Sequence, residues 1–313
     1  MKRPPSRFPS FTYQGVILDP VDLKFAPHPD IIHPSVLATA GRIPEATAPY
    51  LMYYAPHDAP GGICLATAEH PEGPWIEYPE NPLIGADWPP QHQVSHVSSP
   101  HVIWHEEEKQ LFLYYHGEND TTRFATSTDG LHFTYGGTAV DASMLEDGVI
   151  EASYARVFPW QNEYVMFLMG NNQGTRNIYR ADSANGREWH TRPEAYISPP
   201  PGYGQMGPGA LLIRDGEPWL ICFGNLADGP EFEPVSDLLL YTLSPDLNQA
   251  EYHGILMPHS AAGPNNRRIN DPCLLETEDE LYLYVNVGRR LNQKIGLAAC
   301  RTCSRSSQSP TGC

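Results

Sequence analysis

The sequence predicts an all-β fold, a five-bladed β-propeller whose ring is closed by the N-terminal strand. Three observations predict it: many glycines and prolines, an order of strands that recurs five times, and one extra strand near the N-terminus. The 313 residues include 26 glycines and 32 prolines, which indicates many turns and few long helices. A chain of this length buries enough apolar surface to fold without disulfides or metals.

Each repeat begins with a short apolar strand behind a polar or proline-containing cluster. The second residue of this strand recurs every 52 to 66 residues, at Pro34, Pro100, Ala152, Pro208 and Pro272. An apolar, aromatic strand follows in each repeat, at residues 50–56, 111–117, 164–170, 218–224 and 281–288. Runs of this composition are typical of fully buried strands.

The third and fourth strands of each repeat are more polar and end in turns rich in Asp, Gly and Pro. Third strands are expected within residues 62–75, 122–133, 176–189, 237–247 and 294–300. Fourth strands are expected at residues 75–84, 132–140, 189–197 and 250–257. The fifth repeat lacks a fourth strand, and residues 11–18 have the right character to supply it.

Four strands in a fixed order, repeated five times, predict a propeller. A β-sandwich does not explain why the order of the strands recurs. We expect residues 1–300 to form a single propeller domain and residues 301–313 to form a flexible tail.

The charge of the chain limits its partners. It has 20 Lys and Arg against 37 Asp and Glu, a net charge of −17. This balance argues against nucleic acid and anionic membranes, which select basic surfaces.

No run of 18 apolar residues and no signal-peptide core are found, so a soluble protein of undetermined compartment is expected. No obligate protein partner is implied, and Cys300 and Cys303 lack the second ligand pair of a zinc finger.

Candidate binding residues lie in the loops before the first strand and after the second strand of the repeats. In a propeller these loops open on one face, and polar side chains gathered there suggest a polyhydroxyl ligand. We expect a carbohydrate to be bound by His33, His57, Asp58, Trp88, Ser99, His101, His116, Glu118, Arg156, Asn171, Gln173, Gln205, Asn270 and Arg289.

The histidines among these residues have two interpretations. They either hydrogen-bond sugar hydroxyls or hold a divalent metal in the channel, but no two have the i, i+2 or i, i+4 spacing of a metal motif. The sequence therefore predicts no cofactor, with a divalent metal as the alternative. Trp88 is expected to stack on a sugar ring.

The repeats resemble the five-bladed glycosidases of glycoside hydrolase family 43 and its relatives, over roughly residues 11–300. The segment GGICLATAEHPEGPW, residues 61–75, is similar to the first-blade third strand of that family, and IEASYARVF, residues 150–158, resembles its acid-bearing strand. The resemblance implies a glycosidase with Glu151 as general acid. Where the family has aspartates in the first two blades, this chain has His33 and His101.

Asp271 is the favoured candidate for the general base, and Asp30, Asp58 and Glu118 are the other candidates. It begins the first strand of the fifth repeat, two repeats from Glu151, and the resemblance places base and acid two blades apart in that family. Carboxylates from non-adjacent blades face each other across the channel, which predicts an inverting mechanism. Glu151 as a structural ion-pair partner is the alternative for that residue.

Two other functions remain open. One is a polysaccharide lyase, in which a histidine removes the proton beside a uronate carboxylate that a metal, or Arg289 and Arg290, neutralises. The other is a non-catalytic carbohydrate-binding propeller.

Overall fold

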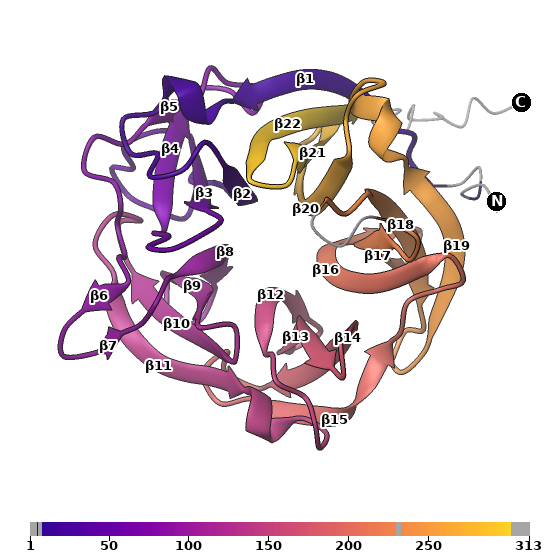
Figure 1. The fold of residues 1–313 in the computed structure, drawn as a ribbon. Helices are drawn as coiled ribbons and strands as arrows, with labels where there is room; N and C mark the ends of the chain where they lie inside the picture. Colours follow the sequence, from indigo (N-terminus) through magenta and orange to yellow (C-terminus); the bar gives the residue numbers. More distant parts are fainter. Residues whose placement is uncertain (1–4, 6–7, 230–232, 302–313) are drawn as a thin grey trace, which may run out of the picture.

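The computed structural model describes residues 5, 8–229 and 233–301. The chain is nearly all β, and its strands are arranged in a ring (Figure 1). Twenty of the 22 described strands pair antiparallel in five groups of four, which we call blades 1 to 5. Single parallel bridges join blade 3 to blade 4, between Arg176 and Gln205, and blade 4 to blade 5, between Ser236 and Arg268.

The strands of each blade follow the order of the repeat. Blades 1 and 2 contain β2 (Ile31–Ala38), β3 (Tyr50–Pro56), β4 (Cys64–Ala68) and β5 (Ile76–Glu77), then β8 (Ser98–His105), β9 (Gln110–Gly117), β10 (Thr121–Ser127) and β11 (Thr134–Asp141). Blades 3 and 4 contain β12 (Ser153–Trp160), β13 (Glu163–Asn172), β14 (Thr175–Ser183) and β15 (His190–Ile197), then β16 (Tyr203–Arg214), β17 (Glu217–Leu226), β18 (Ser236–Leu243) and β19 (Ala250–Met257). Blade 5 contains β20 (Arg268–Glu276), β21 (Glu280–Arg289), β22 (Asn292–Arg301) and β1 (Thr12–Leu18).

The aromatic second strands form the core between neighbouring blades. All five predicted runs are strands, β3, β9, β13, β17 and β21, and most of their residues are buried. Tyr114 of blade 2, for example, packs edge-on against Trp189 of blade 3, with ring centroids 5.9 Å apart. The prediction of these strands from their composition is confirmed.

The N-terminal strand lies at the outer edge of blade 5. β1 pairs antiparallel with β22, from Thr12 opposite Ala299 to Leu18 opposite Ile295. A hydrogen bond from the Lys294 ammonium to the Asp19 carboxylate fastens its end. Residues 12–18 therefore pair at the edge that the sequence predicted for residues 11–18.

Blade 1 departs from the expected pattern. Its fourth strand has only two residues, because Pro79 and Pro82 have no backbone N–H to donate to a ladder. The Asn81 side chain replaces the missing strand: it accepts from the Leu65 N–H over 2.8 Å and donates to the Leu65 carbonyl over 2.9 Å. A hairpin that the sequence did not predict follows, formed by β6 (Asp87–Trp88) and β7 (His92–Gln93).

The innermost strand of every blade is interrupted near its start, where two residues have no ladder partner. The first of the two is His33, Ser99, Tyr154, Pro208 or Asp271 in blades 1 to 5. Except at Pro208, the backbone angle φ of this residue lies between 50° and 57°. This is a left-handed conformation that residues other than glycine rarely adopt. This register corrects the sequence repeat, because the position of Pro272 is occupied by Ala155 in blade 3 and Gly209 in blade 4, not by Ala152 and Pro208.

In the part of the chain that the structure describes, helix is confined to three 3-10 turns, η1 (Pro20–Asp22), η2 (Ala142–Met144) and η3 (His259–Ala262). Within the described residues, no helix is long and apolar enough to cross a membrane. Residues 302–313, which include Cys303 and nearly all of the expected tail, lie outside the described part of the chain.

Candidate functional site

A cavity of about 760 Å³ lies where the five blades meet. Polar side chains from every blade line it, including His57 and Asp58 of blade 1, Ser98, His116 and Asn119 of blade 2, Tyr154 and Arg176 of blade 3, Gln205 and Asn225 of blade 4, and Arg268 and Arg290 of blade 5. Its size is in the range of cavities that bind small molecules.

Tyr154 contributes its ring to the cavity wall from the interrupted start of β12. The ring meets His33 edge-on, with centroids 4.3 Å apart, and stacks on His116 with centroids 5.4 Å apart. Burial raises the pKa of Tyr154 to about 12, and its phenol lies within electrostatic range of Glu151 and Asp271. Neither carboxyl group lines the cavity, but Tyr154, which does, interacts electrostatically with both.

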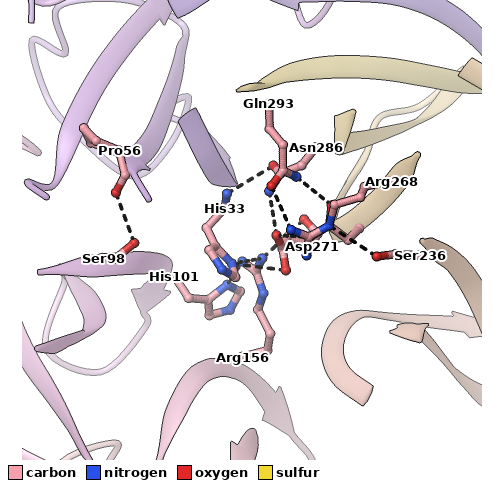
Figure 2. A network of polar contacts seen from close by, with 11 residues as sticks. His33, Pro56, Ser98, His101, Arg156, Ser236, Arg268, Asp271, Asn286 and Gln293 are labelled. Atoms are coloured by element: carbon pink, nitrogen blue, oxygen red, sulfur yellow. Dashed lines mark hydrogen bonds and ion pairs between the residues drawn. The ribbon is translucent and has the colours of Figure 1, made fainter. Parts of the chain in front are cut away.

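Asp271 lies in a buried network at the centre of the ring (Figure 2). Its Oδ2 accepts hydrogen bonds from Nδ2 of Asn270 over 2.7 Å and from Nδ2 of Asn286 over 2.5 Å. Its Oδ1 faces Nδ1 of His33 at 3.6 Å and accepts no hydrogen bond within the described structure. Burial raises the pKa of Asp271 to about 7, against the opposing effect of Arg268 and Arg156.

Arg156 joins the histidines of blades 1 and 2 to this network. Its Nη1 lies 3.4 Å from Nδ1 of His101, and its Nη2 lies 3.4 Å from Nδ1 of His33 and 3.3 Å from the Asp271 carbonyl. Burial and the charge of Arg156 hold the pKa of both imidazoles low, that of His101 at about 3. The two rings are therefore neutral and can accept hydrogen bonds from the guanidinium.

Glu151 lies just before β12 and is also buried. Its Oε2 forms an ion pair with Nε of Arg176 at 2.9 Å, and its Oε1 accepts a hydrogen bond from the Ser153 hydroxyl over 2.8 Å. Arg176 is only 31% exposed and lines the cavity. The ion-pair contact considered as the structural alternative for Glu151 is therefore present.

The structure distributes the predicted site residues over three environments. Those that line the cavity are His57, Asp58, His116 and Gln205. Those buried without lining it are His33, Ser99, His101, Glu151, Arg156, Asn270 and Asp271. Those outside the cavity lining and not buried are Trp88, Glu118, Asn171, Gln173 and Arg289.

Trp88 does not lie where a sugar in the cavity would meet it. Its ring packs edge-on against His92 and Tyr135, with centroids 5.7 and 6.0 Å apart. The hairpin β6–β7 places Trp88 against blade 2. The composition of this loop did not predict a hairpin.

Tyr154, Arg176 and Arg268 line the cavity but were not among the predicted binding residues. A correct alignment of the repeats would have found Tyr154, because it occupies the same position as Asp271. Arg176 and Arg268 sit at the starts of β14 and β20, where the sequence gives no motif.

No group of three or more His, Cys, Asp or Glu side chains suited to hold a metal ion occurs in residues 8–229 and 233–301. His57 instead contacts the Asp58 carboxylate at 2.7 Å. His116 stands beside His96, with ring centroids 5.4 Å apart, and burial holds its pKa low.

Comparison with known proteins identifies the fold. No family model matches the sequence, and no curated protein matches it. Among solved structures, the catalytic domain of a family 62 α-L-arabinofuranosidase from Coprinopsis cinerea has a TM-score of 0.67 at 13% identity, over 96% of this chain and 100% of the other. The chain has the fold of that enzyme.

Two further solved structures share this fold. An α-L-arabinofuranosidase from Podospora anserina, in complex with cellotriose, has a TM-score of 0.64 at 12% identity, over 95% of this chain and 98% of the other. An N-acetylgalactosamine deacetylase from F. plautii, in complex with blood group B trisaccharide, has a TM-score of 0.58 at 13% identity, over 94% and 95%. The fold thus carries different reactions, and the activity of this chain must be argued from its site.

Proposed function

We propose that the chain is a five-bladed β-propeller glycoside hydrolase that binds a polysaccharide or oligosaccharide in its central cavity and cleaves a glycosidic bond. The observation that carries the proposal is the cavity itself, lined by polar side chains from all five blades. The fold shared with two arabinofuranosidases supports it.

The amide groups of blade 4 are suited to sugar hydroxyls. Nδ2 of Asn225 donates to Oε1 of Gln205 over 3.1 Å, and its Oδ1 accepts from the Ser236 hydroxyl over 2.6 Å. These bonds fix the amides before a ligand arrives, which reduces the entropy that binding costs. Asn119 and His57 line the same cavity and complete a set of donors and acceptors for several hydroxyls.

Glu151 and Asp271 are the proposed catalytic carboxyl groups, and their environments favour the reverse of the roles expected from the sequence. Asp271, with a pKa of about 7, retains a proton that it can give to a leaving oxygen. Glu151, paired with Arg176, suits the carboxylate that accepts a proton from water. Because Tyr154 lines the cavity and neither carboxyl group does, the proposal requires the Tyr154 ring to turn when substrate binds.

Hydrolysis assays on a panel of aryl glycosides and plant and microbial polysaccharides test the proposal. Glu151→Gln and Asp271→Asn should each lower kcat by about 10²-fold or more, because each removes one proton-transfer group. Glu194→Gln, an exposed carboxylate on β15, is the matched control and should keep the wild-type rate. A variant of Glu151 or Asp271 near that rate would remove the residue from catalysis, and NMR of the first-formed anomer tests inversion.

Two observations favour other functions strongly enough to include them in the same assay. Both carboxyl groups are buried away from the cavity, as a non-catalytic binding protein would tolerate, and a bound glycan without turnover would indicate that function. His57, His116 and Arg290 line one cavity, which suits a lyase. Absorbance of an unsaturated uronate product would identify that reaction.

A further inference from the structure

The central cavity concentrates positive charge in an acidic protein. The chain carries a net charge of −17, yet among the described residues three arginines, Arg176, Arg268 and Arg290, line the cavity beside a single carboxylate, that of Asp58. Arg176 is already paired with Glu151. The other two cations, Arg268 and Arg290, both belong to blade 5.

Arg268 is buried against neutral groups. Arg268 is only 8% exposed. Its Nε donates to the Ser236 hydroxyl over 3.3 Å, and its Nη1 donates to Oε1 of Gln293 over 3.1 Å. No carboxylate lies within ion-pair distance of it among the described residues. A buried guanidinium without a paired anion is costly, and burial lowers its pKa accordingly.

Arg290 adds a second charge beside the first. It forms no hydrogen bond or ion pair within the described part of the chain, and it acts on Arg268 as a like charge. Two cations that repel each other at the wall of one cavity are stabilised when an anion enters between them.

The nearby carboxyl groups do not occupy this position. Asp58 is bonded to His57, and Asp30 is buried, bonded to the Gln293 backbone and absent from the cavity wall. Asp271 is held by Asn270 and Asn286. These acids attract the arginines from a distance and leave the guanidinium of Arg290 and Nη2 of Arg268 without a direct partner among the described residues.

We propose that the cavity takes an anionic sugar, a unit bearing a carboxylate or a sulfate, and that Arg268 and Arg290 hold its charged group. Guanidinium groups bind such oxyanions with paired, charge-assisted hydrogen bonds. The inference rests on the proposed function for the sugar and adds the class of substrate. It explains why the arginines face a cavity whose remaining wall is suited to hydroxyl groups.

Binding is measured by calorimetry with three free monosaccharides: a hexose, the matching hexuronic acid and the hexose 6-sulfate. Wild-type protein should bind at least one of the two acids at least about tenfold more tightly than the hexose, since one charge-assisted hydrogen bond suffices for that factor. The acid that binds more tightly identifies the anionic group. Equal affinity for hexose and both acids, or no binding of either acid, would overturn the inference.

Arg290→Gln should reduce binding of the preferred acid at least about tenfold and leave binding of the hexose unchanged. Arg289→Gln is the matched control, because Arg289 is exposed, adjacent in sequence and outside the cavity wall. Equal losses in the two variants would contradict the assignment. The free sugars contain no glycosidic bond, so a protein that binds acids but hydrolyses nothing refutes the proposed function alone, whereas hydrolysis restricted to neutral glycosides refutes this inference alone.

Discussion

The entrances to blade 3 and blade 5 each hold a buried carboxyl group, Glu151 and Asp271, which are 3% and 1% exposed. Glu151 contacts a cation, Arg176, at 2.9 Å. Asp271 has two amides and a neutral imidazole as its nearest partners, and its pKa is raised to about 7. The comparison shows that equal burial does not give two acids the same environment, since their polar partners decide how a charge is compensated.

Removal of the Arg176 guanidinium, which pairs with Glu151, should have the largest effect on stability. Arg176→Met leaves Glu151 buried without its ion pair, and we expect the free energy of unfolding to fall by about 3 kcal/mol. Arg214→Met is the control, because Arg214 pairs with Glu276 at 3.3 Å on the surface and should lose less than about 1 kcal/mol. Urea denaturation measures both. Equal losses would mean that Arg176 compensates no buried charge.

In blade 5, replacing the buried carboxyl group of Asp271 by an amide should raise stability at high pH instead of lowering it. The folded pKa of Asp271, about 7, lies above the ordinary value of ~4. The folded state therefore holds the proton more tightly, and the stability this gives is lost as pH rises from 4 through 7. Asp271→Asn should be more stable than wild type at pH 8, by on the order of 2 kcal/mol, and close to wild type at pH 4.

Thermal melts of wild type and Asp271→Asn at pH 4 and pH 8 measure this difference. The pKa values of His33, His101 and His116 are lowered, so these groups act on stability in the opposite direction, which is lost as pH falls below the ordinary histidine value. The effect of His101 and His116 is common to both proteins and cancels in the comparison, whereas His33 lies 3.6 Å from the substituted carboxyl group and belongs to the measured difference. An Asp271→Asn protein that melts below wild type at pH 8 would show that the carboxylate form stabilises blade 5.

The smallest effect is expected from the second partner of Glu151. Ser153→Ala removes the hydroxyl that donates to Oε1 over 2.8 Å and should cost about 1 kcal/mol, with Arg176 still in place. Ser260→Ala, on the exposed turn η3, should change stability by less than about 0.5 kcal/mol. If Ser153→Ala matched Arg176→Met in urea denaturation, the ion pair would not be the main support of Glu151.

The sequence was most informative where each strand is determined by its own composition. The aromatic runs such as residues 50–56 and 281–288 predict buried strands because local apolar content decides burial. The start of β12 was misaligned by three residues, since the proline that marks this place in β2, β8 and β20 is Ala155 in blade 3.

The wall of the cavity was less predictable than the strands. Arg268 reaches it because blade 4 and blade 5 meet at Ser236, a contact between residues 32 positions apart. Trp88 lies outside the cavity wall because the unpredicted hairpin β6–β7 packs its ring against Tyr135. Such placements depend on how blades meet, and no single segment of sequence contains that information.

The pairing of β1 with β22 has a consequence for how the protein is made. Thr12 lies opposite Ala299, so the first strand of the ring to be synthesised has no partner until the last strand of the ring is made. Until then its backbone donors and acceptors face water or other chains, and edge strands in that state are prone to associate. Blades 1 to 4 have all their own strands beforehand, whereas blade 5 is completed only after synthesis passes residue 301. Until blade 5 is complete, the exposed edge of β1 is therefore a place where unfinished chains can associate with one another.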